Sequence, residues 1–239
     1  MSLLFSDENS VWNTAINMTC SYRTHSDVFV PYGRLVFQPK PLADRPNYYE
    51  IAQKKTKTVA WFVSNCNTPS RRMDYVRQMQ PYIDVDIYGA CGTPCPRFQP
   101  QCESDLLDRY KFYLSFENSL CTDYVTEKFF KVFKDDVHVI PVARGGATYR
   151  RYFPANTFVD AADFPSPRHL AEHLKSLSSD TKKYAQMLEE NDMYRMYGGL
   201  GSMWCSLCEL LNTKGPPQKT VNMKRWWSDG HCHSPSDFR

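Results

Sequence analysis

The stretch FENSLCTDYVTEKFF, residues 116–130, decides the fold prediction, because an apolar strand passes into a helix within it. The run KFYLSFE at 111–117 is short and apolar, which is typical of a buried strand. Over 123–133, Val125, Phe129, Val132 and Phe133 recur at helical spacing and predict one apolar helix face. A strand that leads directly into a helix is half of a βαβ unit, so the stretch favours a parallel sheet.

The same alternation continues on both sides of this stretch. Short apolar runs predict strands at 58–64, 85–89, 137–143 and 157–161. Helices are expected over 69–83, from Ser166-Pro167 onward, and in a last helical zone from roughly 181 to 211. Residues 1–46 look irregular, because prolines interrupt the segment QPKPLADRPNYYE. Strands that alternate with helices predict an α/β fold with right-handed crossovers.

Composition excludes several classes of protein. The 239 residues carry a formal charge of +3 with scattered basic residues, so no nucleic-acid partner is expected. No window approaches the ~20 apolar residues of a membrane span, and no signal peptide opens the chain. The nine cysteines and the sequon Asn17-Met18-Thr19, a predicted glycosylation site, nevertheless suit an oxidising, secretory location. We therefore expect a membrane anchor in a full-length form that is absent from this chain.

The opening stretch also carries candidate binding chemistry. Ligands of open α/β sheets bind beyond the carboxyl ends of the strands, where this stretch lies. A helix N-terminus followed by Lys128 would favour phosphate, Glu127 could accept hydrogen bonds from sugar hydroxyls, and Tyr124 could stack or donate. This combination indicates a nucleotide-sugar diphosphate. An acidic helix cap with a Glu127/Lys131 ion pair would give the same pattern, so spacing alone leaves both interpretations open.

The segment YKFYLSFENSLCTDYVTEKFF closely resembles the donor-binding signature of the α1,3/α1,4-fucosyltransferases, F-E-N-S-x-x-x-D-Y-[IV]-T-E-K. Three flanking segments resemble family blocks in the same order: NMTCSYRTHSDVFVPYG (with His25 where an acid is usual), WFVSNCNTPSRRMDYVRQM, and IPVARGGATYRRYFPANTFVDAADF. The likeness covers residues ~13 to ~178. The cysteine-rich tail and the short loop 145–149 are similar to those of the invertebrate and plant core-type branch.

The resemblance implies a GT-B glycosyltransferase with a Rossmann-like parallel-sheet donor domain. Such an enzyme transfers L-fucose from GDP-β-L-fucose, with inversion, in α1,3 linkage to GlcNAc of an N-glycan or glycoprotein acceptor. It needs no obligatory metal ion or other cofactor and works in the Golgi lumen as a type II membrane protein. Residues 1–46 would be a remnant of the N-terminal acceptor-side domain and linker, 47–204 the GDP-fucose-binding domain, and 205–239 the cysteine-rich tail.

The resemblance also assigns roles residue by residue. Arg71, or its neighbour Arg72, and Lys128 would stabilise the departing GDP in place of a metal. The donor would be surrounded by Ser64, Asn65, Arg71, Asn118, Tyr124, Glu127, Lys128 and Tyr149.

The general base is the weak point of this assignment. An inverting transfer needs a carboxylate to deprotonate the acceptor hydroxyl, and in the family it precedes the N-W-T-like block. Only Asp7 and Glu8 are acidic before Asn17, and Glu8 is the better candidate. Most of the acceptor-side domain is therefore expected to be missing. The alternative function is a catalytically impaired fragment or pseudoenzyme that only binds GDP-fucose.

The cysteines leave a second alternative. Cys205 and Cys208, with the HCH run at 231–233, could be read as a zinc site, but the second half lacks a standard ligand spacing. Disulfides are the preferred interpretation. The cysteines on loops around the donor crevice could pair among themselves: Cys91, Cys95, Cys102 and Cys121.

Overall fold

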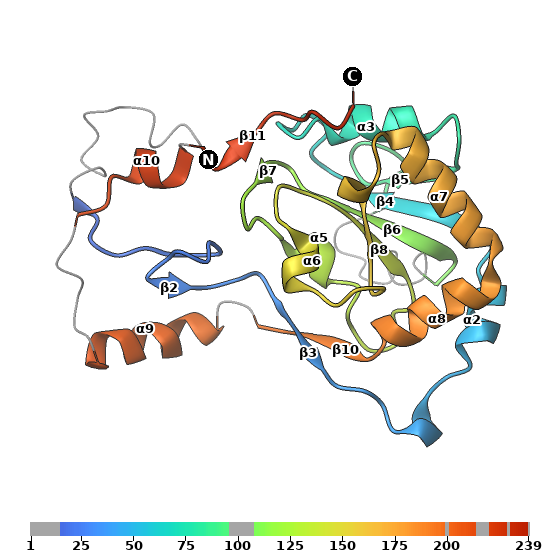
Figure 1. Ribbon diagram of the computed structural model, residues 1–239, viewed down its shortest axis with the longest axis horizontal. Helices are drawn as coiled ribbons and strands as arrows, with labels where there is room; N and C mark the ends of the chain where they lie inside the picture. The colour runs from blue at the N-terminus through green and yellow to red at the C-terminus, as the bar shows by residue number, and fades with distance from the viewer. Residues whose placement is uncertain (1–14, 96–107, 199–200, 214–219, 229, 239) are drawn as a thin grey trace.

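The computed structural model describes residues 15–95, 108–198, 201–213, 220–228 and 230–238. A five-stranded parallel sheet forms its centre, in the order β5-β4-β6-β8-β9 (Figure 1). The strands are β4 (Lys57–Phe62), β5 (Val85–Tyr88), β6 (Tyr110–Phe116), β8 (Ile140–Arg144) and β9 (Val159–Asp160). The α/β prediction and all five predicted strands are confirmed.

The strand order places a topological switch point between β4 and β6. From β4 the chain moves outward to β5, then returns past β4 to β6 and continues through β8 to β9 in the opposite direction. The crossovers that leave β4 and β6 therefore diverge, which opens a crevice beyond the carboxyl ends of these two strands. Ligands of doubly wound sheets bind in this crevice, so the topology locates the candidate site.

Helices cover both faces of the sheet. Alternate residues of β6 point to opposite faces: Phe112, Leu114 and Phe116 join one buried apolar cluster and Tyr113 joins the other. The first cluster is completed by α2 (Tyr48–Lys54), α3 (Arg72–Met79), α7 (Pro167–Ser179) and α8 (Thr181–Asn191). The second is completed by α5 (Glu127–Phe130) and α6 (Tyr149–Tyr152). Burial on both faces explains why the strands read as continuous apolar runs.

The boundaries of α7 follow local chemistry. Ser166 is the N-cap and its side chain accepts a hydrogen bond from the His169 N–H, while Pro167 occupies the first helical turn. Leu170, Leu174 and Leu177 then bury one stripe against the sheet. The helix prediction from Ser166-Pro167 is confirmed.

The helical zone predicted over 181–211 is wrong in its middle. After α8 the chain forms β10 (Tyr194–Tyr197), which pairs antiparallel with β3 (Arg34–Phe37), and only then α9 (Gly201–Thr213). Tyr194 and Met196 pack against the second apolar cluster. Pairing with a strand far away in the sequence overrides the local helical pattern.

Small elements complete the described part of the chain: β1 (Cys20–Ser21), β2 (Val28–Phe29), η2 (Leu42–Asp44), β7 (Leu120–Cys121), η3 (Ala161–Asp163), α10 (Met223–Ser228) and β11 (Cys232–His233). Within the described ranges, no helix has the length and apolar character that a bilayer crossing requires.

Candidate functional site

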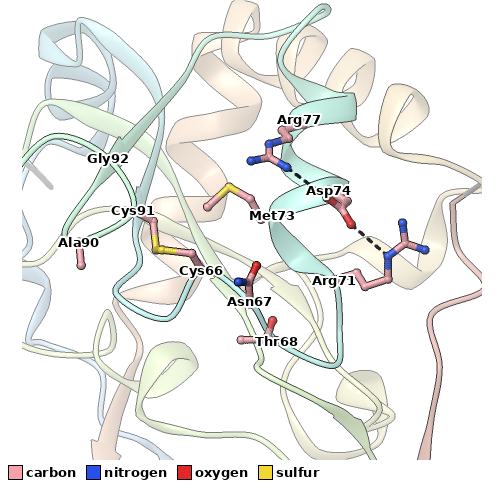
Figure 2. Close-up of a pocket in the computed structure, with 10 residues that line it drawn as sticks. All are labelled: Cys66, Asn67, Thr68, Arg71, Met73, Asp74, Arg77, Ala90, Cys91 and Gly92. Carbon is pink, nitrogen blue, oxygen red and sulfur yellow. Dashed lines mark hydrogen bonds and ion pairs between the residues drawn. A yellow bond between two sulfur atoms is a disulfide. The ribbon is translucent and has the colours of Figure 1, made fainter.

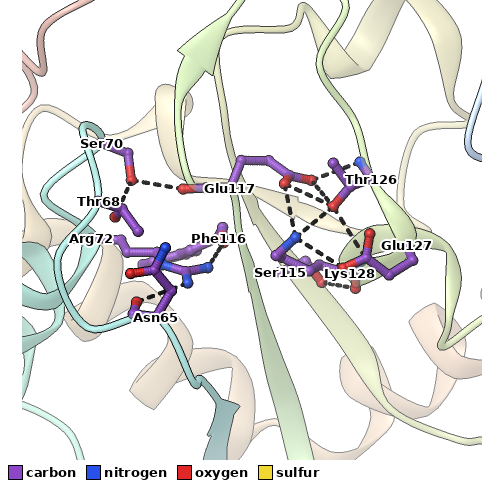
Figure 3. Close-up of polar contacts among 10 residues, drawn as sticks. All are labelled: Asn65, Thr68, Ser70, Arg72, Ser115, Phe116, Glu117, Thr126, Glu127 and Lys128. Carbon is purple, nitrogen blue, oxygen red and sulfur yellow. Dashed lines mark hydrogen bonds and ion pairs between the residues drawn. The ribbon is translucent and has the colours of Figure 1, made fainter. Parts of the chain in front are cut away.

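Two loops meet at the switch point and are held together through Ser70. The Ser70 N–H donates to the Asn118 carbonyl at 3.0 Å. The Ser70 hydroxyl donates to the Glu117 carbonyl at 2.7 Å (Figure 3). Ser70 is fully buried. The loop that follows β4 and the loop that follows β6 therefore form one rigid rim of the crevice.

The two neighbouring arginines at the start of α3 have different surroundings. Arg72 is 3 % exposed and donates from Nη1 to the Phe116 carbonyl at 2.7 Å and from Nη2 to the Asn65 carbonyl at 3.1 Å. The side chain of Arg71 is 57 % exposed and pairs with Asp74 at 3.0 Å. Arg71 takes the left-handed conformation, with φ 48°, which turns it away from its neighbour. Arg72 thus braces the loops, and Arg71 is the arginine open to a ligand.

An open cavity of 610 Å³ lies beside Arg71 (Figure 2). The Cys66–Cys91 disulfide joins the loops after β4 and β5 at its wall. Arg71 and Arg77 both contact the carboxylate of Asp74, so the charged lining is net positive. The cavity is lined by Cys66, Asn67, Thr68, Arg71, Met73, Asp74, Arg77, Ala90, Cys91 and Gly92.

Glu117 is a buried carboxylate at the end of β6, and its side chain is 0 % exposed. It accepts hydrogen bonds from the Thr126 N–H at 2.8 Å and from the Thr126 hydroxyl at 2.8 and 3.0 Å, and the Lys128 ammonium lies 3.5 Å away. Burial raises the pKa of Glu117 even though these partners oppose the shift. Sequence interpretation missed both Glu117 and Thr126, although both lie inside the signature.

Lys128 is held near the end of β6 by three partners. Its ammonium contacts the Thr126 hydroxyl at 2.8 Å and the Glu127 carboxylate at 3.0 Å, besides Glu117. The Lys128 side chain is 19 % exposed and that of Glu127 is 64 % exposed. Burial alone would raise the pKa of Glu127, but the hydrogen bond and charge of Lys128 hold it below the ordinary value. The arrangement presents one oriented cation backed by two carboxylates.

The helix expected over 123–133 is shorter than predicted. Helix α5 spans four residues only, and its N-cap is Thr126 rather than an acidic residue. Asp123 instead accepts hydrogen bonds from Thr24 and Tyr152, and Glu127 pairs with Lys128 rather than Lys131. The predicted apolar face is confirmed as buried. Because so short a helix has little macrodipole, attraction for an anion at this site must come from side-chain charge.

The remaining residues that were predicted to bind the donor differ in their solvent exposure. The side-chain oxygen of Asn118 is buried and has no hydrogen-bond partner among the described residues, which leaves an acceptor free at the rim. Tyr124 is half-buried and packs against Tyr22 and Tyr32. Tyr149 is fully buried among phenylalanines, so it belongs to the core and has no open face toward the crevice. Ser64 and Asn65 are exposed on the loop after β4.

The cysteines pair differently from the sequence expectation. Cys91 bonds Cys66 and Cys121 bonds Cys232, so the predicted pairing among the crevice loops is wrong for these two. Cys205 and Cys208 are exposed free thiols. With Cys232 in a disulfide, the alternative zinc site loses a ligand. Cys95 is also disulfide-bonded, and Cys102 lies outside the described residues.

Of two other predicted residues, the structure describes only one. Asn17, the predicted glycosylation site, is exposed, whereas Glu8 lies outside the described residues. Among the described ranges, no cluster of three histidine, cysteine, aspartate or glutamate side chains is arranged to hold a metal ion.

Sequence comparison identifies relatives over most of the chain. Residues 52–227 match the family described as glycosyltransferase family 10 (fucosyltransferase) C-term. The chain is 38 % identical to alpha-(1,3)-fucosyltransferase C of Drosophila melanogaster, over 93 % of this chain and 56 % of that protein. It is 36 % identical to glycoprotein 3-alpha-L-fucosyltransferase A of the same organism, over 90 % of this chain and 42 % of that protein. The chain thus spans about half the length of these relatives.

Solved structures share the fold. A crystal structure of an alpha1,3-fucosyltransferase with GDP-fucose superposes with a TM-score of 0.54 at 24 % identity, over 68 % of this chain and 49 % of that chain. The same enzyme type with GDP gives 0.55 at 23 % identity, again over 68 % and 49 %. The predicted Rossmann-like, GT-B type fold is confirmed by this likeness and by the five-stranded parallel sheet. The chain belongs to glycosyltransferase family 10, the fucosyltransferases.

Proposed function

We propose that the protein transfers L-fucose from GDP-β-L-fucose, with inversion, in α1,3 linkage to GlcNAc of N-glycans. The observation that carries this proposal is the Lys128 ammonium, oriented by Glu117 and Thr126 at the end of β6. Arg71 stands open on the other loop of the same switch point, which Ser70 ties to β6. The fold neighbour solved with GDP-fucose supports a donor of this class. The cysteine-rich tail supports a core-type acceptor.

The chemistry follows from these charges. The acceptor oxygen attacks the anomeric carbon of fucose on the face opposite GDP, and the bond from that carbon to the β-phosphate oxygen breaks. The departing GDP gains negative charge, which Lys128 and Arg71 stabilise where other enzymes use a metal ion. Asn118 can accept a hydrogen bond from the nucleotide sugar through its free side-chain oxygen. Glu127 can accept hydrogen bonds from hydroxyls of ribose or fucose.

A base must take the proton of the acceptor hydroxyl. Our candidate is Glu8, because only Asp7 and Glu8 are acidic before Asn17. Glu8→Gln should abolish transfer and leave GDP binding unchanged, and Asp7→Asn is its matched control. Transfer at an unchanged rate by Glu8→Gln would exclude this residue as the base.

We place this activity in the Golgi lumen. The two disulfides between described cysteines support an oxidising compartment, because disulfides seldom persist in the cytosol.

The decisive experiment is GDP-fucose turnover with a core chitobiose glycan and a GlcNAc-terminated glycan as acceptors. Lys128→Ala should lower kcat on the order of 100-fold, since its charge acts mainly on the transition state. Lys134→Ala is the matched control, because Lys134 is an exposed lysine on the segment that follows α5. A higher KM for GDP-fucose with an unchanged kcat would show that Lys128 only positions the diphosphate.

The second candidate function is binding of GDP-fucose without transfer. It is favoured by one observation: the carboxylates of Glu117 and Glu127 at the site are both paired with Lys128, so neither is offered to an acceptor hydroxyl as a base. Isothermal titration with GDP-fucose, run beside the turnover assay, separates the two functions. Donor binding without turnover of either acceptor would support the binding protein, and absence of both would refute the two proposals together.

A further inference from the structure

The last described residues form a strap, defined here as Cys232–Phe238, that runs from β7 past the end of β8 to α3. Strand β11 pairs antiparallel with β7, and Cys232 bonds Cys121. From β11 the chain runs on to its end beside α3 (Figure 1). The strap lies beyond residues 52–227, the part of the chain that matches the family. The residues that it contacts all lie inside the matched part.

The first contact of the strap is an ion pair with a buried arginine. Arg144, the last residue of β8, is 2 % exposed. Asp237 binds it with both carboxylate oxygens, at 2.6 Å from Nε and 2.9 Å from Nη2. The remaining terminal nitrogen, Nη1, donates to the Ser70 carbonyl at 3.0 Å. A buried guanidinium needs a counterion, so Asp237 keeps Arg144 where it can hold the main chain of Ser70.

The second contact reaches the next residue, Arg71. Phe238 is 8 % exposed, and its ring packs edge-on against Tyr75 with 5.5 Å between centroids. The guanidinium carbon of Arg71 lies 5.2 Å from the centroid of the Phe238 ring. A cation over an aromatic face is attracted by the ring quadrupole. The strap therefore acts on the two residues that precede α3. It reaches Ser70 only through Arg144, which binds the Ser70 carbonyl, and it contacts the side chain of Arg71 directly.

The backbone at this position needs such support. Arg71 adopts a left-handed conformation that non-glycine residues seldom take, and surrounding contacts must fix it. Its side chain is otherwise held at one point, by Asp74. The Phe238 ring makes a second contact with the Arg71 guanidinium. Asp237 holds Arg144, which in turn binds the carbonyl of the preceding residue, Ser70.

We propose that the strap is a positioning element for the diphosphate-binding arginine: Asp237 fixes the turn at Ser70 and Phe238 orients the Arg71 guanidinium. This inference rests on the proposed function of Arg71. The strap acts by removing alternative orientations of Arg71 before the diphosphate arrives, which strengthens binding without any contact between strap and nucleotide.

A double-mutant cycle tests the proposal through the dissociation constant of GDP, measured by isothermal titration well below the unfolding temperature. Phe238→Leu keeps apolar bulk and removes the ring, so it should weaken GDP binding by about 3-fold, as expected for one cation–π contact. Phe238→Tyr keeps the ring and should bind GDP as the unaltered protein does. In an Arg71→Ala background, Phe238→Leu should have no further effect.

Two further variants separate positioning from stability. Phe164→Leu changes a partly buried phenylalanine that packs against the same apolar cluster beside His173 of α7, and should lower thermal stability while leaving GDP affinity unchanged. Asp237→Asn removes the counterion of Arg144 and should weaken GDP binding, again only when Arg71 is present. Equal effects of Phe238→Leu with and without Arg71 would overturn the positioning role.

The outcomes distinguish this inference from the proposed function. GDP binding that depends on Arg71 but not on Phe238 or Asp237 would overturn the strap alone. Absence of GDP binding by the unaltered protein would refute the proposed function, and the strap with it.

Discussion

Glu117→Gln is the substitution that tests the electrostatics of the site most directly. The side chain keeps its shape and its acceptor oxygen for Thr126, but it can no longer ionise. Burial raises the pKa of Glu117 above the ordinary value of 4.5, whereas the same group in the unfolded chain titrates near that value. The substitution therefore removes a group whose protonation differs between the folded and unfolded chains.

The sign and size of the effect follow from this difference. Above pH 4.5 the unfolded chain loses the proton while the folded chain keeps it, so stability falls as pH rises toward the folded pKa. Each pH unit inside this window lowers the free energy of unfolding by about 1.4 kcal/mol. The variant is free of this loss. It has instead a pH-independent cost of about 1 kcal/mol, because the amide nitrogen of glutamine is a donor and cannot accept the hydrogen bond from the Thr126 hydroxyl.

Urea unfolding at intervals between pH 4.5 and pH 8 measures the difference in unfolding free energy between variant and unaltered protein. As pH rises, the Glu117→Gln variant should become more stable relative to the unaltered protein. This relative gain should level off above the pKa of Glu117 in the folded chain. Glu127→Gln is the matched control, and its difference should stay flat across this pH range. The pKa of Glu127 is held down by Lys128, so its stabilising contribution is complete above the ordinary pKa and is lost only in acid.

A difference that stays flat, or that moves in favour of the unaltered protein as pH rises, would refute the reasoning. Either result would mean that Lys128, 3.5 Å away, outweighs the cost of burying the carboxylate. We expect burial to win, because Lys128 also contacts Glu127 and remains 19 % exposed, so water and a second carboxylate weaken its hold on Glu117.

Three further predictions concern stability. Ser166→Ala removes the α7 cap and should lower the free energy of urea unfolding by about 1 kcal/mol. Gly146→Ala would place a methyl group against the Cys121 backbone, so it should lower the melting temperature through a loss of about 1–3 kcal/mol, with Ala147→Gly as its comparison. Replacing Cys121 and Cys232 together by serine opens a long loop and should cost about 2–4 kcal/mol under oxidising conditions and nothing under reducing ones.

Local chemistry made the sheet and α7 predictable. Strands such as β6 are buried on both faces, so their apolar runs are unbroken, and the Ser166-Pro167 start of α7 needs no distant partner. The short α5 could not be predicted, because distant residues delay its start. Asp123 has φ 61° and accepts hydrogen bonds from Thr24 and Tyr152, so the helix begins only after its N-cap Thr126. Pairing of β10 with β3 and the disulfide between β7 and β11 are also long-range.

The candidate site likewise has some features that the local sequence predicts and others that depend on the folded structure. Its residue types were visible in the signature, so the carboxylate of Glu127 and the ammonium of Lys128 were predictable. The roles of Arg71 and Arg72 were not, because adjacent arginines have the same chemistry and only the left-handed turn sends them to different surroundings. Glu117 was overlooked because a sequence does not show which acidic side chain is buried.

Glu117 also bears on why the crevice is built this way. An ion pair with one fully buried partner is weak evidence for stability, since removing the charge from water costs as much as the pairing returns. The carboxylate is instead well placed to orient Lys128, whose flexible side chain would otherwise sample many rotamers. The strap does for Arg71 what Glu117 does for Lys128. One cation is oriented by a buried acidic side chain and the other by an aromatic ring. Lys128 lies in α5, which follows β6, and Arg71 lies at the start of α3, which follows β4. Under the proposed function, a diphosphate would meet the charges of Lys128 and Arg71 with both side chains already oriented. The entropic cost of ordering these side chains would then fall on folding and not on binding.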